Sequence, residues 1–176
     1  MGADLTNPAI SVETERLFLV ALAPDHADFL FSMLSDSDHT RYLTLPTPQC
    51  LGDVRGMIEG LLSAPGNCLW IIRFKAGGGF VGMCGFLGDS TVPNFVYGIA
   101  ENQKGNGYAR EAAMAAIEAG RRILGTDRVE VNIHSGNVKS LRIADELGFA
   151  KTGECRHIYP QQGGLATTYV FQKSWV

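Results

Sequence analysis

The chain has 176 residues, a formal net charge of −3, and 45% hydrophobic against 19% charged residues. This balance is typical of a globular domain and excludes a disordered chain, and a slightly acidic protein is poorly suited to non-specific nucleic-acid binding. Even the longest apolar run, over residues 17–23, is too short to cross a bilayer, and the N-terminus lacks the pattern of a secretory signal. We therefore expect one domain over residues 1–176, with residues 1–12 as an N-terminal extension, a cytoplasmic location, and neither a nucleic-acid nor a membrane partner.

Hydrophobic spacing and turn residues predict strands and helices in the order βααβββαβαββ. In chain order, the predicted elements are a strand at 16–22, a helix from about 24 to 34, a loop at 36–49, a helix from about 54 to 62, strands at 68–74, 80–87 and 95–100, a helix at 109–124, a strand at 128–133, a short helix at 138–147, and strands at 149–156 and 167–175. This order predicts a mixed α/β domain with one sheet.

The cysteines and histidines do not form a metal-binding pattern. Cys50, Cys68, Cys84 and Cys155 contain no CxxC pair, and three of the four are expected in apolar surroundings. Small buried hydrophobes are therefore expected rather than a disulfide framework or a zinc site. The four histidines are scattered along the sequence, so we expect no metal cofactor.

Glycine is over-represented, with 21 residues in 176, about 12% against a usual level of about 7%. Gly105 and Gly107 lie where a predicted strand passes into an alanine-rich helix, and they remove Cβ atoms beside the unpaired first amides of that helix. Such amides can converge on an anion with the help of the helix dipole, and the geometry suits a pyrophosphate. A strand-to-helix turn that binds nothing is the alternative; neither the P-loop nor the dinucleotide fingerprint matches.

The same stretch resembles a known family signature. Lys104-x-x-Gly107-x-Ala109 resembles the acetyl-CoA signature of the GCN5-related N-acetyltransferase (GNAT) superfamily, [Gln/Arg]-x-x-Gly-x-[Gly/Ala]. The run GNGYAREA is similar to the GKGYATEA of the ribosomal-protein N-terminal acetyltransferase branch. Asn137-x-x-Ser140, followed by Leu-Gly-Phe at 147–149, is similar to a second family motif, and residues 13–17 are similar to the start of that branch.

The resemblance covers about residues 13–173 and implies the family's fold. That fold is α/β, with a mixed, mostly antiparallel central sheet of about seven strands flanked by about four helices. It implies an acyltransferase that moves the acetyl group of acetyl-CoA, as co-substrate, to a primary amine by direct attack in a ternary complex. The amine would be a protein N-terminus or a small amine, and the protein would be a monomer or homodimer.

The resemblance also implies site residues. Ser140 is expected to protonate or hydrogen-bond the departing sulfur, and Glu101 is the nearest carboxylate that could act as a base through water. Asn137 is expected to bind a pantetheine amide, cap its helix, or both. A free backbone N–H near Ile99 or Ala100 is expected to stabilise the oxyanion. The predicted cofactor-binding residues are Ile99, Ala100, Glu101, Lys104, Gly105, Asn106, Gly107, Tyr108, Ala109, Arg110, Asn137 and Ser140.

Three positions depart from the family pattern. Lys104 replaces Gln or Arg, Asn94 replaces a glutamate found in many relatives, and Ala144 replaces the tyrosine acid of some relatives. The missing glutamate and tyrosine leave open a non-catalytic acyl-CoA-binding module of the same fold. A site without a clear base favours α-amines, with a pKa near about 8, over lysine side chains, with a pKa near about 10.4.

We expect the acceptor pocket to be built by the variable segment between the first two helices and by the last hairpin. The candidates are His39, Arg41, Tyr42, Leu43, Arg156, Tyr159 and the turn at 161–164, while His134, at the end of its strand, could face the cleft.

Overall fold

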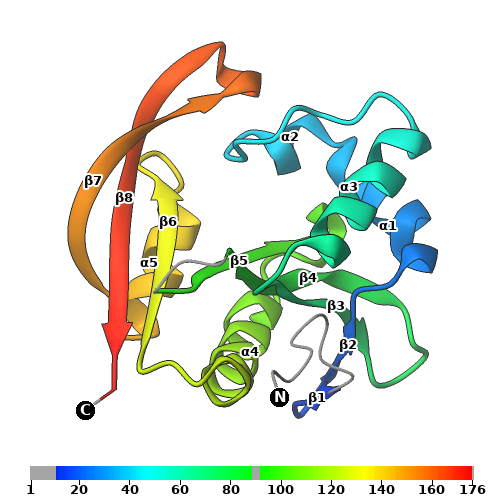
Figure 1. The fold of residues 1–176 in the computed structure, drawn as a ribbon. Coiled ribbons are helices and arrows are strands. Elements are labelled where there is room, and N and C mark those ends of the chain that lie inside the picture. Colours follow the sequence, from blue (N-terminus) through cyan, green and yellow to red (C-terminus); the bar gives the residue numbers. More distant parts are fainter. Residues whose placement is uncertain (1–10, 89–91, 176) are drawn as a thin grey trace.

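The computed structural model describes residues 11–88 and 92–175, which form one sheet with helices on both faces (Figure 1). The strands are β1 (Val12–Glu13), β2 (Leu17–Ala21), β3 (Cys68–Phe74), β4 (Phe80–Leu87), β5 (Asn94–Ile99), β6 (Arg128–His134), β7 (Ala150–Tyr159) and β8 (Gly164–Ser174). The helices are α1 (Ala27–Leu34), α2 (Ser37–Thr40), α3 (Leu51–Ser63), α4 (Tyr108–Leu124) and α5 (Val138–Glu146), with short 3-10 turns η1 (Pro24–His26), η2 (Glu101–Gln103) and η3 (Pro160–Gln162).

The eight strands follow the order β1-β2-β3-β4-β5-β6-β8-β7. Every neighbouring pair is antiparallel except β5 and β6, which are parallel and are paired only at Asn94 and Glu130. Beyond that point the two strands diverge, and Figure 1 shows β6, β8 and β7 as a curved unit beside the rest of the sheet. The expected mixed, mostly antiparallel sheet is confirmed, with β1 as an additional short strand.

Alternating residues of the sheet build a core on each face. Trp70 and Phe86 pack with the buried alanines of α4 and α5, whereas Leu69 and Ile71 pack with α1 and α3. Helix α4 lies close to the sheet because Gly120 faces Phe86; a Cβ at that position would be 2.0 Å from the Phe86 ring.

Two expectations about local structure need correction. Residues 36–49 contain the four-residue helix α2, because Asp36 caps it by accepting hydrogen bonds from the amides of Asp38 and His39. Only two of the four cysteines are buried, Cys68 and Cys84, and burial raises the pKa of Cys68 to about 12. Cys50 and Cys155 are exposed, because the first precedes α3 and the second lies on the solvent-facing edge strand β7.

Candidate active site

The glycine turn lies directly before α4, which begins at Tyr108. Gly105 and Gly107 have φ values of 84° and 79°, in the left-handed region that disfavours side chains. The first intrahelical bond runs from the Glu111 amide to the Gly107 carbonyl at 3.1 Å. The amides of residues 108–110 therefore precede the helical ladder and face outward from the helix start, where an anion is favoured.

A charged cluster that the sequence did not predict fixes this turn. Glu111, in the first turn of α4, accepts hydrogen bonds from Arg16 Nε at 2.6 Å, from the Arg16 amide at 2.9 Å and from Thr14 Oγ1 at 2.5 Å. Arg16 Nη1 also donates to the Asn106 carbonyl at 3.1 Å, and its guanidinium stacks on Tyr108. Partial burial raises the pKa of Glu111, but the hydrogen bonds from Thr14 and Arg16 outweigh it and hold the pKa below its ordinary value.

The remaining charged residues near the turn are engaged with other parts of the chain. Lys104 forms an ion pair with Glu101 across η2, so the predicted phosphate cation and the predicted carboxylate base contact each other. Arg110 pairs with Glu146 at 3.5 Å and connects α4 to α5. Ala109 and Arg110 occupy the first turn of α4, as predicted.

The divergence of β5 from β6 exposes backbone groups on one side of β5. The Ala100 amide donates to the Val81 carbonyl at 2.9 Å, so Ala100 is not the free oxyanion donor that was considered. Since hydrogen-bonding directions alternate along an antiparallel pair, the Ile99 amide points away from β4 and toward the diverging β6. Of the two candidates, Ile99 has the required geometry.

Asn137 and Ser140 lie at the start of α5, across the divergence from β5. Asn137 caps the helix, because its side-chain oxygen accepts from the Ser140 amide at 3.2 Å. The buried Tyr97 hydroxyl lies next to the Ser140 side chain without a hydrogen bond of standard geometry, and burial raises the Tyr97 pKa. Ala144, at the position of the missing tyrosine, is buried in the core. No role for the Tyr97 side chain was predicted from the sequence, because only the strand pairing brings it to α5.

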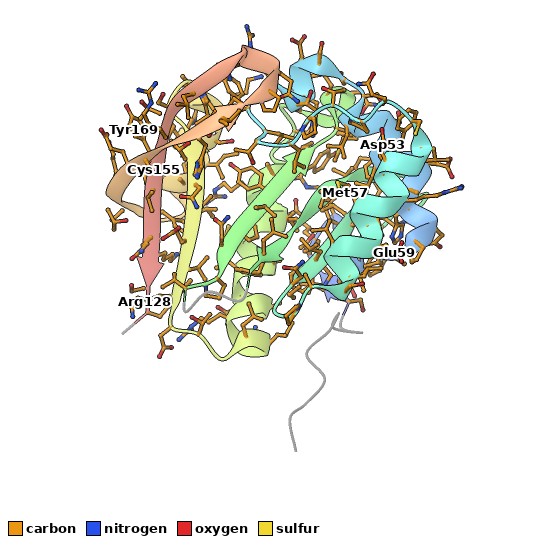
Figure 2. The ribbon with its side chains drawn as sticks, turned by 45° about the horizontal axis from the view of Figure 1, so that its top comes forward. Asp53, Met57, Glu59, Arg128, Cys155 and Tyr169 are labelled. Carbon is orange, nitrogen blue, oxygen red and sulfur yellow. The ribbon has the colours of Figure 1, made fainter. Side chains whose placement is uncertain are left out.

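The two predicted acceptor segments contact each other. Gln162 Nε2 donates to the Arg41 carbonyl at 2.8 Å, and Gln161 Nε2 donates to the Leu45 carbonyl at 2.7 Å. The tip of the β7–β8 hairpin therefore lies on the segment that joins α2 to α3. Figure 2 shows α3, labelled at Asp53, Met57 and Glu59, and β8, labelled at Tyr169, on opposite sides of β5.

Aromatic rings from β6, from β7 and from the segment after α2 meet near this contact. The His134 ring stacks edge-on against Tyr159 at 4.5 Å and lies 5.0 Å from the Tyr42 ring. Burial lowers the pKa of His134, and the nearby Gln162 side chain partly offsets the shift. Arg156 is not in this group, because its guanidinium donates to the Leu165 carbonyl on β8. Leu43 packs instead on the α1–α3 core.

Buried polar atoms without a hydrogen-bond partner cluster around the divergence. Among the described residues, five side-chain atoms are of this kind: His39 Nδ1, Tyr97 Oη, Asn132 Oδ1, His134 Nε2 and Gln161 Oε1. Three belong to β5 and β6, and the other two belong to the acceptor segments. Since buried polar groups are normally paired, this concentration marks a place where a polar ligand would complete the hydrogen bonding.

The family is established by sequence comparison. A model of the acetyltransferase (GNAT) domain matches residues 16–150, so the chain belongs to the GNAT acetyltransferase family. It is thus an acetyl-CoA-dependent acyltransferase.

Individual relatives agree with this assignment. The chain is 29% identical over 164 residues to an uncharacterized N-acetyltransferase, p20, of Bacillus licheniformis, covering 90% of this chain and 92% of the relative. The fold of this chain is similar to that of a spermidine N-acetyltransferase of Vibrio cholerae in complex with CoA and spermine. The TM-score is 0.81 at 16% identity, and the match covers 90% of this chain and 95% of the other. The fold is also similar to that of the microcin C7 self-immunity acetyltransferase MccE in complex with acetyl-CoA and AMP (TM-score 0.78, 16% identity, 92% and 93% covered).

Membrane-spanning helices and metal-binding clusters are absent from residues 11–88 and 92–175. No helix there is both long and apolar enough to cross a membrane. No three His, Cys, Asp or Glu side chains in the same ranges are grouped so that they could hold a metal ion.

Proposed function

We propose that this enzyme acetylates a primary amine by direct attack on acetyl-CoA bound between β5 and β6. The observation that carries the proposal is the divergence of these strands, which has the glycine turn at one end and the unpartnered polar atoms around it. The structures of the MccE and spermidine acetyltransferases hold acetyl-CoA or CoA on the same fold, which supports a CoA ligand here.

In this proposal, the turn at 104–110 binds the pyrophosphate through its backbone. Gly105, Asn106 and Gly107 shape the turn, and the amides of Tyr108, Ala109 and Arg110 donate to the anion. When the ligand binds, Lys104 would leave Glu101 and pair with the phosphate. The Glu101 carboxylate and the phosphate are both anions and would compete for the same ammonium group. Arg16 and Glu111 hold the turn in place without contacting the ligand.

The reacting end of acetyl-CoA would lie near Ile99. The outward Ile99 amide would donate to the thioester oxygen as negative charge develops on it. Asn137 keeps its amide donors available while its oxygen caps α5, so it could also bind the pantetheine arm. Ser140, with Tyr97 next to it, would supply a proton or hydrogen bond to the departing sulfur.

The acceptor side favours an amine without several positive charges. The side chains near it include His39, Tyr42, His134, Tyr159 and two glutamines, none of which carries a negative charge. A polyamine would require carboxylates to replace its hydration, whereas an α-amine or an aromatic monoamine fits this lining. We therefore place protein N-termini and small monoamines ahead of polyamines.

The proposal is tested by two measurements on the full-length protein. Titration with CoA followed by calorimetry tests the binding site, and no heat at millimolar CoA would refute it. Release of free thiol from acetyl-CoA, with a panel of peptide N-termini, monoamines and polyamines, tests the transfer. Tight CoA binding without thiol release for any acceptor would favour the non-catalytic module instead.

A further inference from the structure

One side chain from outside the sheet reaches the diverging strand β5. It is His39, on the short helix α2, which Asp36 caps at one end. Its ring lies against Gly98: a Cβ at that position would be 3.2 Å from both Cε1 and Nε2. Because that distance is tighter than ordinary contact, a larger residue at 98 would push the ring away from the strand.

The two ring nitrogens of His39 have different surroundings. The backbone of Ile99, the residue proposed to bind the thioester oxygen, lies close enough to the ring to raise its pKa, and Nε2 and Cε1 are the ring atoms nearest Gly98. Nδ1 is buried and has no partner among residues 11–88 and 92–175. A neutral imidazole that donates through Nε2 presents an unshared electron pair at Nδ1.

The groups around His39 keep it in the neutral form. Burial lowers its pKa, and the Lys104 ammonium lowers it further, while Asp36, Glu101 and the Ile99 backbone partly oppose the shift. The Met33 side chain of α1, which carries no charge, also lies near Gly98. At neutral pH the ring can therefore accept a proton.

We propose that His39 is the catalytic base that takes the proton from the acceptor amine. This inference rests on the acetyl transfer proposed above. As the amine nitrogen forms its bond to the thioester carbonyl carbon, one N–H proton moves to Nδ1 of His39. The C–S bond then breaks, its electron pair stays on sulfur, and the thiolate takes a proton through Ser140. The imidazolium later releases its proton to water, and Ser140 regains one from water, so protons balance over the cycle.

His39 fits this role better than Glu101, the carboxylate considered from the sequence. Glu101 lies beyond the end of β5, is half-exposed and is ion-paired with Lys104. His39 instead lies on the backbone of Gly98 and Ile99, where the reacting carbonyl is expected. The base therefore comes from a helix outside the sheet, on the acceptor side.

The test compares His39→Gln with a matched control, His26→Gln. His26 is also buried with a lowered pKa, but it lies on η1 against Phe80, away from the diverging strands. We expect His39→Gln to lower kcat/KM by about 100-fold or more, with CoA affinity unchanged. In the wild type, kcat/KM should fall as the pH drops below the ordinary histidine range, because His39 becomes protonated. This decrease of kcat/KM at low pH, the acid limb of the pH profile, should disappear in His39→Gln and remain in His26→Gln.

A second readout does not depend on turnover. In nitrogen-detected NMR of the histidine rings, His39 should be the Nε2-protonated tautomer, and its signals should shift when CoA is added, whereas those of His26 should not. Normal turnover with an unchanged acid limb in His39→Gln would overturn the role of His39 but leave acetyl transfer standing. His39 signals that do not shift when CoA binds would also overturn the proposed role of His39. A wild type that binds CoA but acetylates no amine would remove both proposals.

Discussion

The distance between α4 and the sheet depends on a glycine, and this dependence can be tested with one pair of substitutions. In Gly120→Ala, the new methyl group would be 2.0 Å from Cε2 and 2.7 Å from two other atoms of the Phe86 ring. Phe86 is fully buried and also contacts Phe95, so its ring has little room to move. We expect α4 to be displaced from the sheet.

The expected size follows from two opposing effects. Overpacking a well-filled core costs about 1–3 kcal/mol, and alanine gains about 1 kcal/mol over glycine in a helix. The net result for Gly120→Ala should be a loss of up to about 2 kcal/mol of unfolding free energy. Gly56→Ala, on the exposed face of α3 with nothing within 4 Å of the new Cβ, should instead gain about 0.5–1 kcal/mol.

Equilibrium urea unfolding, followed by far-ultraviolet circular dichroism, measures both variants against the wild type. Both substitutions replace glycine with alanine in a helix. Changes of opposite sign in their free energies of unfolding would therefore be due to the contact with Phe86. Equal stability for the two variants would refute the argument that Gly120 sets the helix position. A change in the slope of unfolding free energy against urea concentration in Gly120→Ala would mean that the surface exposed on unfolding has changed. The effect would then not be a local clash alone.

Further predictions concern the turn, the leaving group and the charged cluster. Gly107→Val should abolish CoA binding in calorimetry, because the left-handed backbone is lost, whereas Gly125→Ala, which imposes similar strain at the other end of α4, should bind CoA normally. Ser140→Ala should lower the rate of thiol release with little change in CoA affinity; an unchanged rate would remove Ser140 from the mechanism. Because the Glu111 pKa is lowered in the folded protein, its contribution to stability is present above the ordinary glutamate pKa and is lost as the pH falls through the lowered value. Glu111→Gln should therefore be less stable than the wild type at neutral pH, and unfolding curves for the two proteins should converge in acid; a constant difference would contradict this.

The sequence predicted the parts of the site that depend on local chemistry. Gly105 and Gly107 lie between a strand pattern and a helix pattern, which predicted a turn there. Asn137 has the side chain of a helix cap. Neither prediction needed knowledge of distant residues. Most element boundaries were predicted for the same reason. Helix α2 was missed because four residues are too few to show helical periodicity.

The parts that were missed depend on contacts between distant segments. Arg16 and Glu111 are adjacent only after β2 packs beside α4, and Tyr97 meets Ser140 only across the two diverging strands. The Ala100 amide was misjudged because the direction of an N–H group in a strand depends on its pairing register, which composition does not determine. The closeness of His39 to Gly98 likewise appears only in three dimensions.

The hydrogen bonds between the hairpin tip and the α2–α3 segment do not depend on the side chains of that segment. Gln161 and Gln162 donate to the carbonyl oxygens of Leu45 and Arg41, which belong to the main chain. Since every residue type presents the same carbonyl, side chains at positions 41 and 45 can be exchanged without loss of these two hydrogen bonds. If the acceptor binds as proposed, substitutions in this segment would change acceptor preference while the hairpin stays attached to it.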